Sequence, residues 1–452
     1  MPRLPPKLLY RLFPLAGRAS FWVERRLTPA GRMVFALGVG ALLFGVDMRQ
    51  TLAYQVAALA LAALVAARLA GVGWRPRLTI SRVLPDFATR GTSLVYFVEI
   101  ANHGQRVERD LVLGDSLLTP ALDYAAFQRR RAGDGRRRGN IVDRAIGFPR
   151  WVALRRHDRG ADLGLVEVPA IAPGARLRVP VELTPLRRGA LRFEAIELYR
   201  PDPLGLYRSR HRVVVADTLL ALPRRHPMPV FHLRSERHYQ RGGISLAHAV
   251  GDSQEFAALR DYRPGDPRRH IHWRSFARTG QLVVKEYQDE YFDRHALVID
   301  THVASGPLLE GVVEVAASIA AGRRGQDSIL DLLFAGREVI ELGTGRGLGD
   351  EIRALAYLAE VDAGGEATLD DLAALLDERA GQLASVVCVL AGSEPARRAL
   401  VTRLAALGIA VVSLELTLDD STQAPRAHGA ERHFTIRVGH LGEDLARVST
   451  TA

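Results

Sequence analysis

Two apolar runs, close together near the start of the chain, are the strongest hydrophobic pattern in the sequence. Residues 33–46 read MVFALGVGALLFGV and residues 51–67 read TLAYQVAALALAALVAA, with only Asp47-Met48-Arg49-Gln50 between them. Each run is near the short limit of the roughly 17–25 residues that a membrane-spanning helix needs. We therefore predict a transmembrane helical hairpin over residues 29–70. The alternative is a buried helical hairpin in a soluble protein.

Polar residues mark both ends of this predicted hairpin. Thr28-Pro29 is typical of a helix start, with a hydroxyl cap followed by proline at the first helical position. Arg32 and Arg68 can extend to one membrane interface and so lengthen the apolar spans. Lysine and arginine cluster before the first run and after the second, and the positive-inside rule then places both ends in the cytoplasm. We expect a multi-pass membrane protein whose soluble domains are cytoplasmic.

The segment before the hairpin, residues 1–28, is basic with scattered apolar positions. Two interpretations of this cytoplasmic leader stay open. It is either an amphipathic segment that lies on an anionic membrane surface or a disordered basic leader.

Alternating apolar and polar positions characterise residues 78–222. The strand-like segments are LTISRVL, TSLVYFVEIAN, RLRVPVELTP, GALRFEAIELYR and RHRVVVADTLLALP. Glycine, proline, asparagine and aspartate bound them, a pattern that predicts short strands joined by turns. We predict a β-sandwich-like domain here.

Residues 291–445 show a different texture, in which continuous apolar strands alternate with amphipathic helices. HALVID, SILDLLFA, REVIEL, SVVCVLAG and IAVVSLEL read as strands, with helical segments between them. This alternation predicts an α/β domain with a mostly parallel sheet covered on both faces. The chain is therefore multidomain, and residues 223–290 link the two soluble domains.

The linking segment is dense in charges, aromatic residues and turn residues. Arginines and carboxylates nearly balance over residues 251–290, and tryptophan, tyrosine and phenylalanine are interleaved with them. A solvated face seldom has this composition, and buried charges need partners to offset their desolvation. We predict a partly buried polar network at a seam between the domains.

This segment closely resembles the signature of the bacterial domain-of-unknown-function 58 family. The matching pieces include Glu255-Phe256, Tyr262-Arg263-Pro264-Gly265-Asp266, Arg269-His270-Ile271-His272-Trp273, Ala277-Arg278 and Leu282-Val283-Val284-Lys285-Glu286. The resemblance implies a membrane hairpin in the bacterial inner membrane, a β domain and a von Willebrand A-like (Rossmann-like) C-terminal domain. It also implies association with a MoxR-type AAA+ ATPase. The residues that we expect to form the interdomain and interaction signature are Glu255, Phe256, Arg260, Tyr262, Arg263, Pro264, Gly265, Asp266, Arg269, Trp273, Arg278, Lys285 and Glu286.

Two turns in the β domain, Arg188-Gly189 and Asp202-Pro203-Leu204-Gly205-Leu206, resemble the family's approach to this signature. The resemblance implies that one sheet edge packs toward the signature there. The same residues are also ordinary turn residues, and we assign them no catalytic role.

Charge is concentrated in two segments. The formal net charge is +11, but residues 1–32 and the arginine-rich insert 129–159 together carry more than this excess. This local distribution argues against a general nucleic-acid-binding surface. For the insert itself, docking on anionic lipid headgroups, a solvated loop and nucleic-acid binding stay open in that order. Cys388 lies in an apolar run and is expected to be a core residue, and a single cysteine fits a reducing compartment.

The sequence offers only weak candidates for a metal site or a phosphate site. In von Willebrand A-like domains an Asp-x-Ser-x-Ser motif ends the first strand and holds a divalent cation. The corresponding stretch begins at Asp300, but His302 and Ala304 replace the two hydroxyl ligands, so Mg²⁺ is disfavoured and Asp300 is only a weak candidate. His270 and His272 have no third ligand nearby, and the loop 343–349 lacks the Gly-Lys-Ser/Thr ending of a P-loop. We expect no cofactor and assign no catalytic residue.

Three functional hypotheses follow. We expect a non-catalytic, membrane-anchored adaptor that works with the ATPase on client proteins or the cell envelope. The second hypothesis is an enzyme that uses the signature carboxylates and arginines on an envelope precursor, since balanced charge in a cleft is compatible with perturbed pKa values. The third is a structural protein that binds anionic lipid through the arginine-rich insert. The sequence does not indicate an oligomeric state.

Overall fold

The computed structural model describes residues 6–44, 51–119, 124, 148–229, 254–266, 268–289, 293–322, 328–335, 339–344, 348–364, 368–419 and 432–448. The connection 47–50, most of the arginine-rich insert and part of the loop 343–349 lie outside these residues. The chain forms two compact units, residues 1–224 with 355–360, and the remainder.

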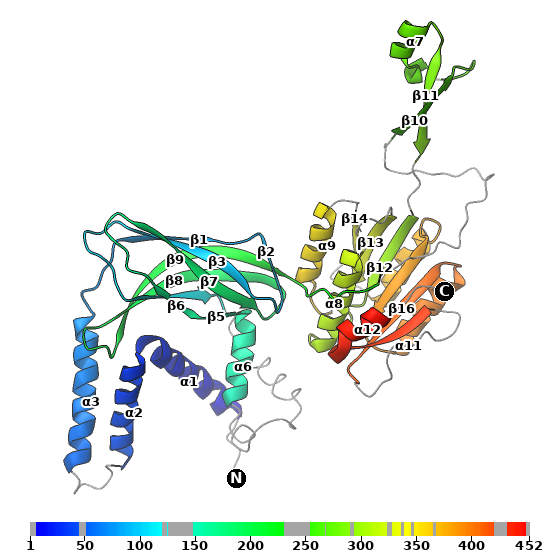
Figure 1. Cartoon of the computed structure of the whole chain (residues 1–452). Coiled ribbons are helices and arrows are strands. Elements are labelled where there is room, and N and C mark those ends of the chain that lie inside the picture. Colours follow the sequence, from blue (N-terminus) through cyan, green and yellow to red (C-terminus); the bar gives the residue numbers. More distant parts are fainter. Residues whose placement is uncertain are drawn as a thin grey trace. The chain divides into compact units, whose positions relative to one another are not determined.

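The first unit begins with three helices, α1 (Pro6–Arg26), α2 (Pro29–Phe44) and α3 (Thr51–Ala70). The leader is therefore largely helical. Figure 1 shows α2 and α3 side by side. The stretch Leu52–Ala70 is long and apolar enough to cross a membrane, whereas the apolar stretch Pro29–Leu43 is shorter. Side chains such as Leu43 and Leu59 are 70% and 73% exposed, which suits contact with lipid better than a protein core.

A tight junction joins the start of α2 to the β domain. Thr28 caps the helix as predicted, because its hydroxyl accepts the Gly31 N–H at 3.0 Å. The same hydroxyl donates to the Gly205 carbonyl at 2.5 Å. Gly31 lies so close to the backbone of Leu206 that an added Cβ would be 1.9 Å from its carbonyl oxygen. Only glycine fits this approach without movement of the backbone.

The turn at residues 202–206 forms the β-domain side of this junction. The Asp202 carboxylate accepts the backbone N–H groups of Leu204 and Leu206, at 2.7 and 2.9 Å, and Gly205 has a φ of 67°. Within the first unit this turn contacts the start of α2. The packing toward the signature that the family resemblance implies stays a prediction. The turn chemistry itself is as expected.

Two sheets follow the helices, and both belong to the first unit. One has the order β1-β3-β7-β5 and the other the order β2-β9-β8-β4-β6, with all pairs antiparallel except β2 and β9. The bounds are β1 Leu78–Val83, β2 Phe87–Thr89, β3 Leu94–Asn102, β4 Leu111–Leu117, β5 Ala161–Leu163, β6 Leu165–Val168, β7 Arg176–Pro185, β8 Gly189–Pro201 and β9 Arg208–Leu222. Residues such as Val98, Leu113, Val181 and Leu198 are fully buried in one core shared by both sheets. This agrees with the alternating pattern of the sequence.

The described end of the arginine-rich insert is helical, which differs from the solvated loop that was one of the open interpretations. Residues Phe148–Arg159 form helix α6, which contacts α1 and β5. Trp151 and Phe13 pack together, with ring centroids 6.1 Å apart. This aromatic contact with α1 stabilises α6, whose many arginines contribute little apolar surface.

The second unit contains a six-stranded sheet with the order β14-β13-β12-β15-β16-β17. The bounds are β12 Asp293–Ile299, β13 Ser328–Ala335, β14 Val339–Thr344, β15 Ser385–Leu390, β16 Ala410–Thr417 and β17 Arg432–Arg437. All neighbours are parallel except β13 and β14. The predicted mostly parallel α/β sheet is confirmed. Cys388 is fully buried in its core, and burial raises the pKa of the thiol to about 12.

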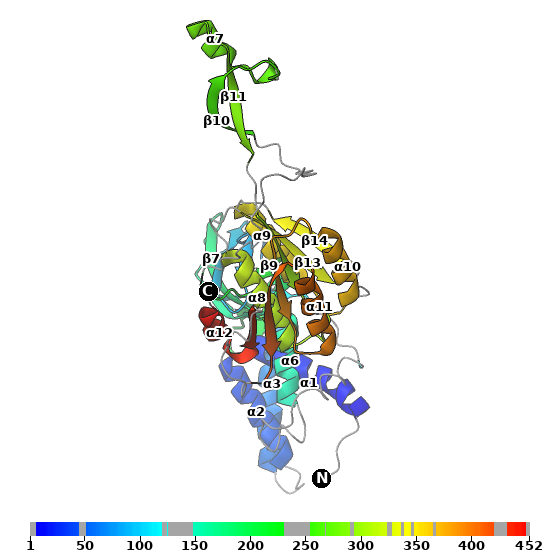
Figure 2. The same ribbon diagram turned by 90° about the vertical axis from the view of Figure 1, so that its right-hand side faces the viewer.

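Helices cover both faces of this sheet. Figure 2 shows α10 (Leu369–Arg379) and α11 (Pro395–Ala406) on one side, with α8 (Pro307–Gly322) and α12 (Leu441–Arg447) on the other. Helix α9 (Leu348–Glu360) precedes α10. Thr368 and Asp371 form a capping box at the start of α10. The sheet order changes direction between β12 and β15, which is where ligands bind in open α/β sheets.

Candidate functional site

The signature segment forms a small β-hairpin that carries a short helix. Strands β10 (Gln254–Asp261) and β11 (Val283–Asp289) pair antiparallel, with a bulge between Phe256 and Ala258. A 3₁₀ turn (Arg268–His270) and helix α7 (Trp273–Thr279) lie between the strands. Ile271 pairs with Val284, and these two side chains are only 7% and 2% exposed. They form a minimal apolar core for the hairpin.

One ion pair closes the loop of this hairpin. The Arg260 guanidinium donates two hydrogen bonds to the Asp266 carboxylate, at 2.8 and 2.7 Å, and the Arg263 N–H donates a third at 2.8 Å. These bonds, that of the Arg260 side chain above all, hold the pKa of Asp266 at about 2. The carboxylate is therefore ionised at neutral pH and is a weak base. Gly265, with a φ of 109°, makes the turn between them possible.

Large apolar side chains of the hairpin are exposed. Trp273 and Phe276 form an edge-to-face pair with centroids 6.2 Å apart, yet they are 60% and 38% exposed. Leu259 and Leu282 are also exposed, at 42% and 39%. Exposed tryptophan and phenylalanine held in fixed geometry are typical of protein-binding surfaces.

The remaining signature residues occupy both strands and the loop. Lys285 lies opposite Leu259 in the strand pairing, and the Tyr262 N–H donates to the Leu282 carbonyl at 3.0 Å. The Arg269 side chain donates to His270 at 3.2 Å. Glu255, Phe256 and Glu286 lie in the strands, Pro264 in the turn and Arg278 in α7, and the side chains of the first three are outside the described part. The role of this set in joining the domains stays a prediction.

The histidines of the signature make hydrogen bonds within the hairpin. The His272 ring shares a hydrogen bond with the Ser275 hydroxyl at 2.7 Å. Within the residues that the structure describes, no group of three histidine, cysteine, aspartate or glutamate side chains is placed to hold a metal ion.

Asp300 lies at the direction change of the α/β sheet, directly after β12. Its carboxylate accepts hydrogen bonds from the backbone N–H groups of His302 and Ala391, at 2.9 and 3.0 Å. The Arg397 guanidinium of α11 donates to the same carboxylate, and both side chains are buried. The position that a cation would take beside Asp300 is thus held by an arginine of the chain itself.

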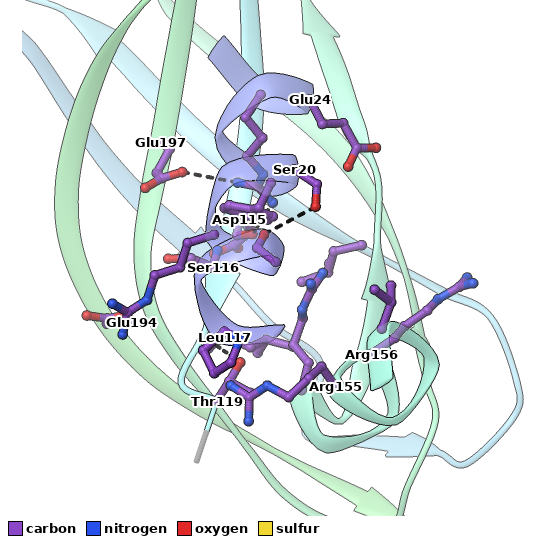
Figure 3. Close-up of a pocket in the computed structure, with 18 of the residues that line it drawn as sticks. Ser20, Glu24, Asp115, Ser116, Leu117, Thr119, Arg155, Arg156, Glu194 and Glu197 are labelled. Carbon is purple, nitrogen blue, oxygen red and sulfur yellow. Dashed lines mark hydrogen bonds and ion pairs between the residues drawn. The ribbon is translucent and has the colours of Figure 1, made fainter. Parts of the chain in front are cut away.

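A cavity of about 910 Å³ lies in the first unit between α1, α6 and strands β4, β5, β8 and β9. Figure 3 shows Glu24 on α1, Arg155 and Arg156 on α6, and Asp115 and Glu197 on the strands around it. Seven arginines line it: Arg18, Arg25, Arg155, Arg156, Arg159, Arg210 and Arg212. Five carboxylates line it as well: Glu24, Asp115, Asp162, Glu194 and Glu197. Cavities of this size can hold a small-molecule ligand.

A buried polar network forms the strand side of this cavity. Arg82 makes a two-point ion pair with Asp115, at 2.9 and 2.8 Å, and both side chains are fully buried. Tyr96 donates to Asp115 at 2.7 Å. Burial, followed by the nearby charge of Asp115, raises the pKa of Tyr96. Arg25 of α1 pairs with Glu197 at 3.1 Å, which attaches the helix to the sheet.

Sequence reasoning missed this network. The single signal was the presence of charged residues, Arg82 and Asp115, in otherwise apolar strand segments. A charge in a strand normally indicates an outward-facing position, and only the packing of the two sheets shows that these two face each other.

Comparisons with known proteins give little guidance. No family model matches the chain. A Bacillus subtilis (strain 168) protein described as "Uncharacterized protein YeaD" is 32% identical over 145 residues, which are 30% of this chain and 34% of that protein. The chain thus covers about a third of that relative's length.

Solved structures show only remote likeness. A PapD-like domain of human CEP192 has a TM-score of 0.18 at 13% identity, over 32% of this chain and 86% of that one. A Vibrio harveyi GH20 exo-β-N-acetylglucosaminidase has a TM-score of 0.16 at 9% identity, over 75% and 57%. Neither value supports an assignment of fold or activity.

Proposed function

We propose that this protein is a membrane-anchored interaction protein that presents its signature hairpin to a protein partner. The exposed Trp273–Phe276 pair is the observation that carries this proposal. The Arg260–Asp266 ion pair and the buried Ile271 and Val284 side chains stabilise the hairpin, so its exposed aromatic groups need little further ordering upon binding. Binding energy at protein interfaces is concentrated in such aromatic anchors.

The partner in this proposal is a MoxR-type AAA+ ATPase, in the assembly or maturation of client proteins or of the cell envelope. This part rests on the resemblance of the signature to the domain-of-unknown-function 58 family. The proposal treats the α/β domain as von Willebrand A-like, with Asp300 after its first strand. Helices α2 and α3 form a two-span anchor in the bacterial inner membrane, and the soluble domains face the cytoplasm. Basic residues at both ends of the helix pair support this orientation.

An enzymatic role of the signature has weaker support. A general acid or base works best with a pKa near the working pH, whereas hydrogen bonds from Arg260 and Arg263 hold the pKa of Asp266 at about 2. The Asp266 carboxylate is occupied by these bonds and serves the turn.

Purification of the tagged full chain from detergent-solubilised membranes of its own bacterium, with and without nucleotide, tests the proposal. The wild type is expected to recover an AAA+ ATPase, and the double variant Trp273→Ala/Phe276→Ala is expected to lose it. Leu418→Ala is the matched control, because Leu418 is 60% exposed in the α/β unit. Recovery of no ATPase by the wild type, or equal recovery by the double variant, contradicts the proposal.

A further inference from the structure

The cavity beneath α1 holds positive charge that its own carboxylates do not neutralise. Four of its five carboxylates already have arginine partners: Asp115 pairs with Arg82, Asp162 with Arg156, Glu194 with Arg212, and Glu197 with Arg25 and Arg210. Arg18 and Arg159 line the cavity and form no ion pair among the described residues. These two guanidinium groups are available to an anionic ligand.

Arg159 is crowded by like charge. Burial, followed by the neighbouring Arg25 cation, lowers its pKa, although the group stays charged at neutral pH. Its guanidinium lies 5.8 Å from the centre of the Phe21 ring. A bound anion relieves the repulsion between these arginines, and guanidinium groups recognise phosphate through paired hydrogen bonds.

Aromatic and aliphatic side chains line the cavity together with these arginines. Tyr10, Phe21, Trp151 and Val152 contribute there. The Trp151 ring lies so close to α1 that a Cβ on Gly17 would be 2.4 Å from it. A ligand that suits the whole cavity therefore has both an anionic group and hydrocarbon.

The surroundings of α1 indicate the source of such a ligand. The helix exposes Leu12, Leu15 and Trp22, at 45%, 60% and 47%, and it leads through Leu27 into α2. A basic helix with exposed aromatic and aliphatic residues is suited to a membrane interface. A helix at the membrane interface meets the lipids of the bilayer directly. A membrane lipid is therefore a better candidate for the ligand than a soluble phosphate ester.

We propose that this cavity binds an anionic phospholipid, with Arg18 and Arg159 on the phosphate group and the Trp151 side receiving the start of an acyl chain. The lining includes Arg155, Arg156 and Arg159 from the described end of the arginine-rich insert 129–159. The site does not depend on the proposed ATPase partner. Its size accommodates a headgroup and a short length of hydrocarbon.

Native mass spectrometry of the detergent-solubilised full chain tests the site. Dioleoyl phosphatidylglycerol and dioleoyl phosphatidylcholine are added in equal amounts, and glycerol phosphate is added in a separate arm. The wild type is expected to retain phosphatidylglycerol in preference to phosphatidylcholine and to bind glycerol phosphate at least roughly tenfold more weakly. Equal retention of the two lipids overturns the proposal, and tight binding of glycerol phosphate overturns its lipid part.

Charge variants separate the cavity from lipid around the helices. Arg18→Gln/Arg159→Gln is expected to lower phosphatidylglycerol retention roughly tenfold or more, since hydrogen bonds to charged groups are among the stronger ones. Arg109→Gln/Arg176→Gln removes two exposed arginines that do not line the cavity, and it is expected to retain lipid as the wild type does. Equal losses in both double variants contradict the proposal.

A filling variant tests the same site without loss of charge. Ser20 lies on α1, is exposed and lines the cavity, so Ser20→Trp keeps every arginine while it takes up space. Reduced phosphatidylglycerol retention with an unchanged unfolding temperature is expected. Unchanged retention by a folded Ser20→Trp protein contradicts binding inside the cavity.

Discussion

The β domain and the signature hairpin both combine arginines, carboxylates and aromatic rings, but they place them differently. In the β domain the Arg82–Asp115 pair has no exposed side-chain surface, and the Arg82 guanidinium lies 4.4 Å from the centre of the Phe193 ring. In the hairpin the side chains of Arg260 and Asp266 are 36% and 15% exposed, and Trp273 is 60% exposed. Similar residue types thus form a buried network in one region and an exposed cluster in the other.

The surrounding scaffold explains this difference. Arg82 and Asp115 lie on two sheets that share a large core, so their charges are removed from water and must be paired. Among the hairpin side chains that the structure describes, only Ile271 and Val284 are buried apolar residues, and Trp273 stays 60% exposed. Charge balance in a sequence therefore indicates pairing, but it does not indicate burial.

Removal of Arg82 is expected to have the largest effect and tests the buried network of the β domain. Arg82→Ala leaves Asp115 buried without its cation, and we expect a loss of about 3–5 kcal/mol in the stability of the β domain. Hydrogen exchange of β3 and β4, read by mass spectrometry in the full chain, measures this loss. Arg156→Ala breaks a half-exposed pair with Asp162 and is expected to cost about 0–1 kcal/mol. Equal effects of the two variants contradict the buried network.

The α/β unit offers an independent test through Arg397. Arg397→Ala leaves the buried Asp300 carboxylate without its cation. We expect a loss of about 3–5 kcal/mol in the stability of that unit. The double variant Arg397→Ala/Asp300→Asn removes the unpaired charge and is expected to recover part of the loss. Exchange protection of β12 and β15 reports both effects. If the double variant is no more stable than the single one, charge pairing does not explain the contact.

A smaller effect is expected where α2 meets the β domain. Gly31→Ala forces a methyl group against the Leu206 carbonyl, and overpacking of this kind costs about 1–3 kcal/mol. Faster exchange in the turn 202–207 is the measurement. Gly40 lies in the same helix with no atom within 4 Å of an added Cβ, so Gly40→Ala is the control and is expected to leave the turn unchanged.

The smallest effect on stability is expected in the hairpin. Hydrogen bonds from Arg260 and Arg263 hold the pKa of Asp266 at about 2, below the usual 3.8. Because the folded pKa is depressed, the stabilisation is present above about pH 4 and is lost as pH falls through 2. Arg260→Ala is expected to raise the Asp266 pKa toward 3.8 while global unfolding stays unchanged, which carboxylate NMR titration can follow. An unchanged pKa in the variant contradicts the ion pair.

Much of the fold could be predicted from hydrophobic periodicity. Five strands of the β domain (β1, β3, β7, β8 and β9), the cap at Thr28 and the core position of Cys388 all follow from local pattern. The strands β4 and β17 were missed, because Gly114 and Asp115 interrupt the first and basic residues flank the second. Helix α6 was missed because its stability comes from the contact of Trp151 with α1, which no local pattern reveals.

The arginine cavity could not be predicted, since its lining comes from six separate elements. Arg18, Arg159 and Glu197 are far apart in the sequence, and only the packing of α1 and α6 against the sheet brings them together. The signature hairpin, in contrast, is continuous in sequence, so its residues could be identified in advance. The exposure of these residues could not be predicted, because it depends on which side chains the folded hairpin buries.

Photo-crosslinking from the signature hairpin in living cells tests the central claim most directly. A benzoylphenylalanine is placed at position 273, with position 418 as the matched exposed control. We predict a crosslink from position 273 to an AAA+ ATPase and none from position 418. Crosslinks from position 273 that reach only other parts of the same chain contradict the claim that the hairpin presents its aromatic residues to a partner.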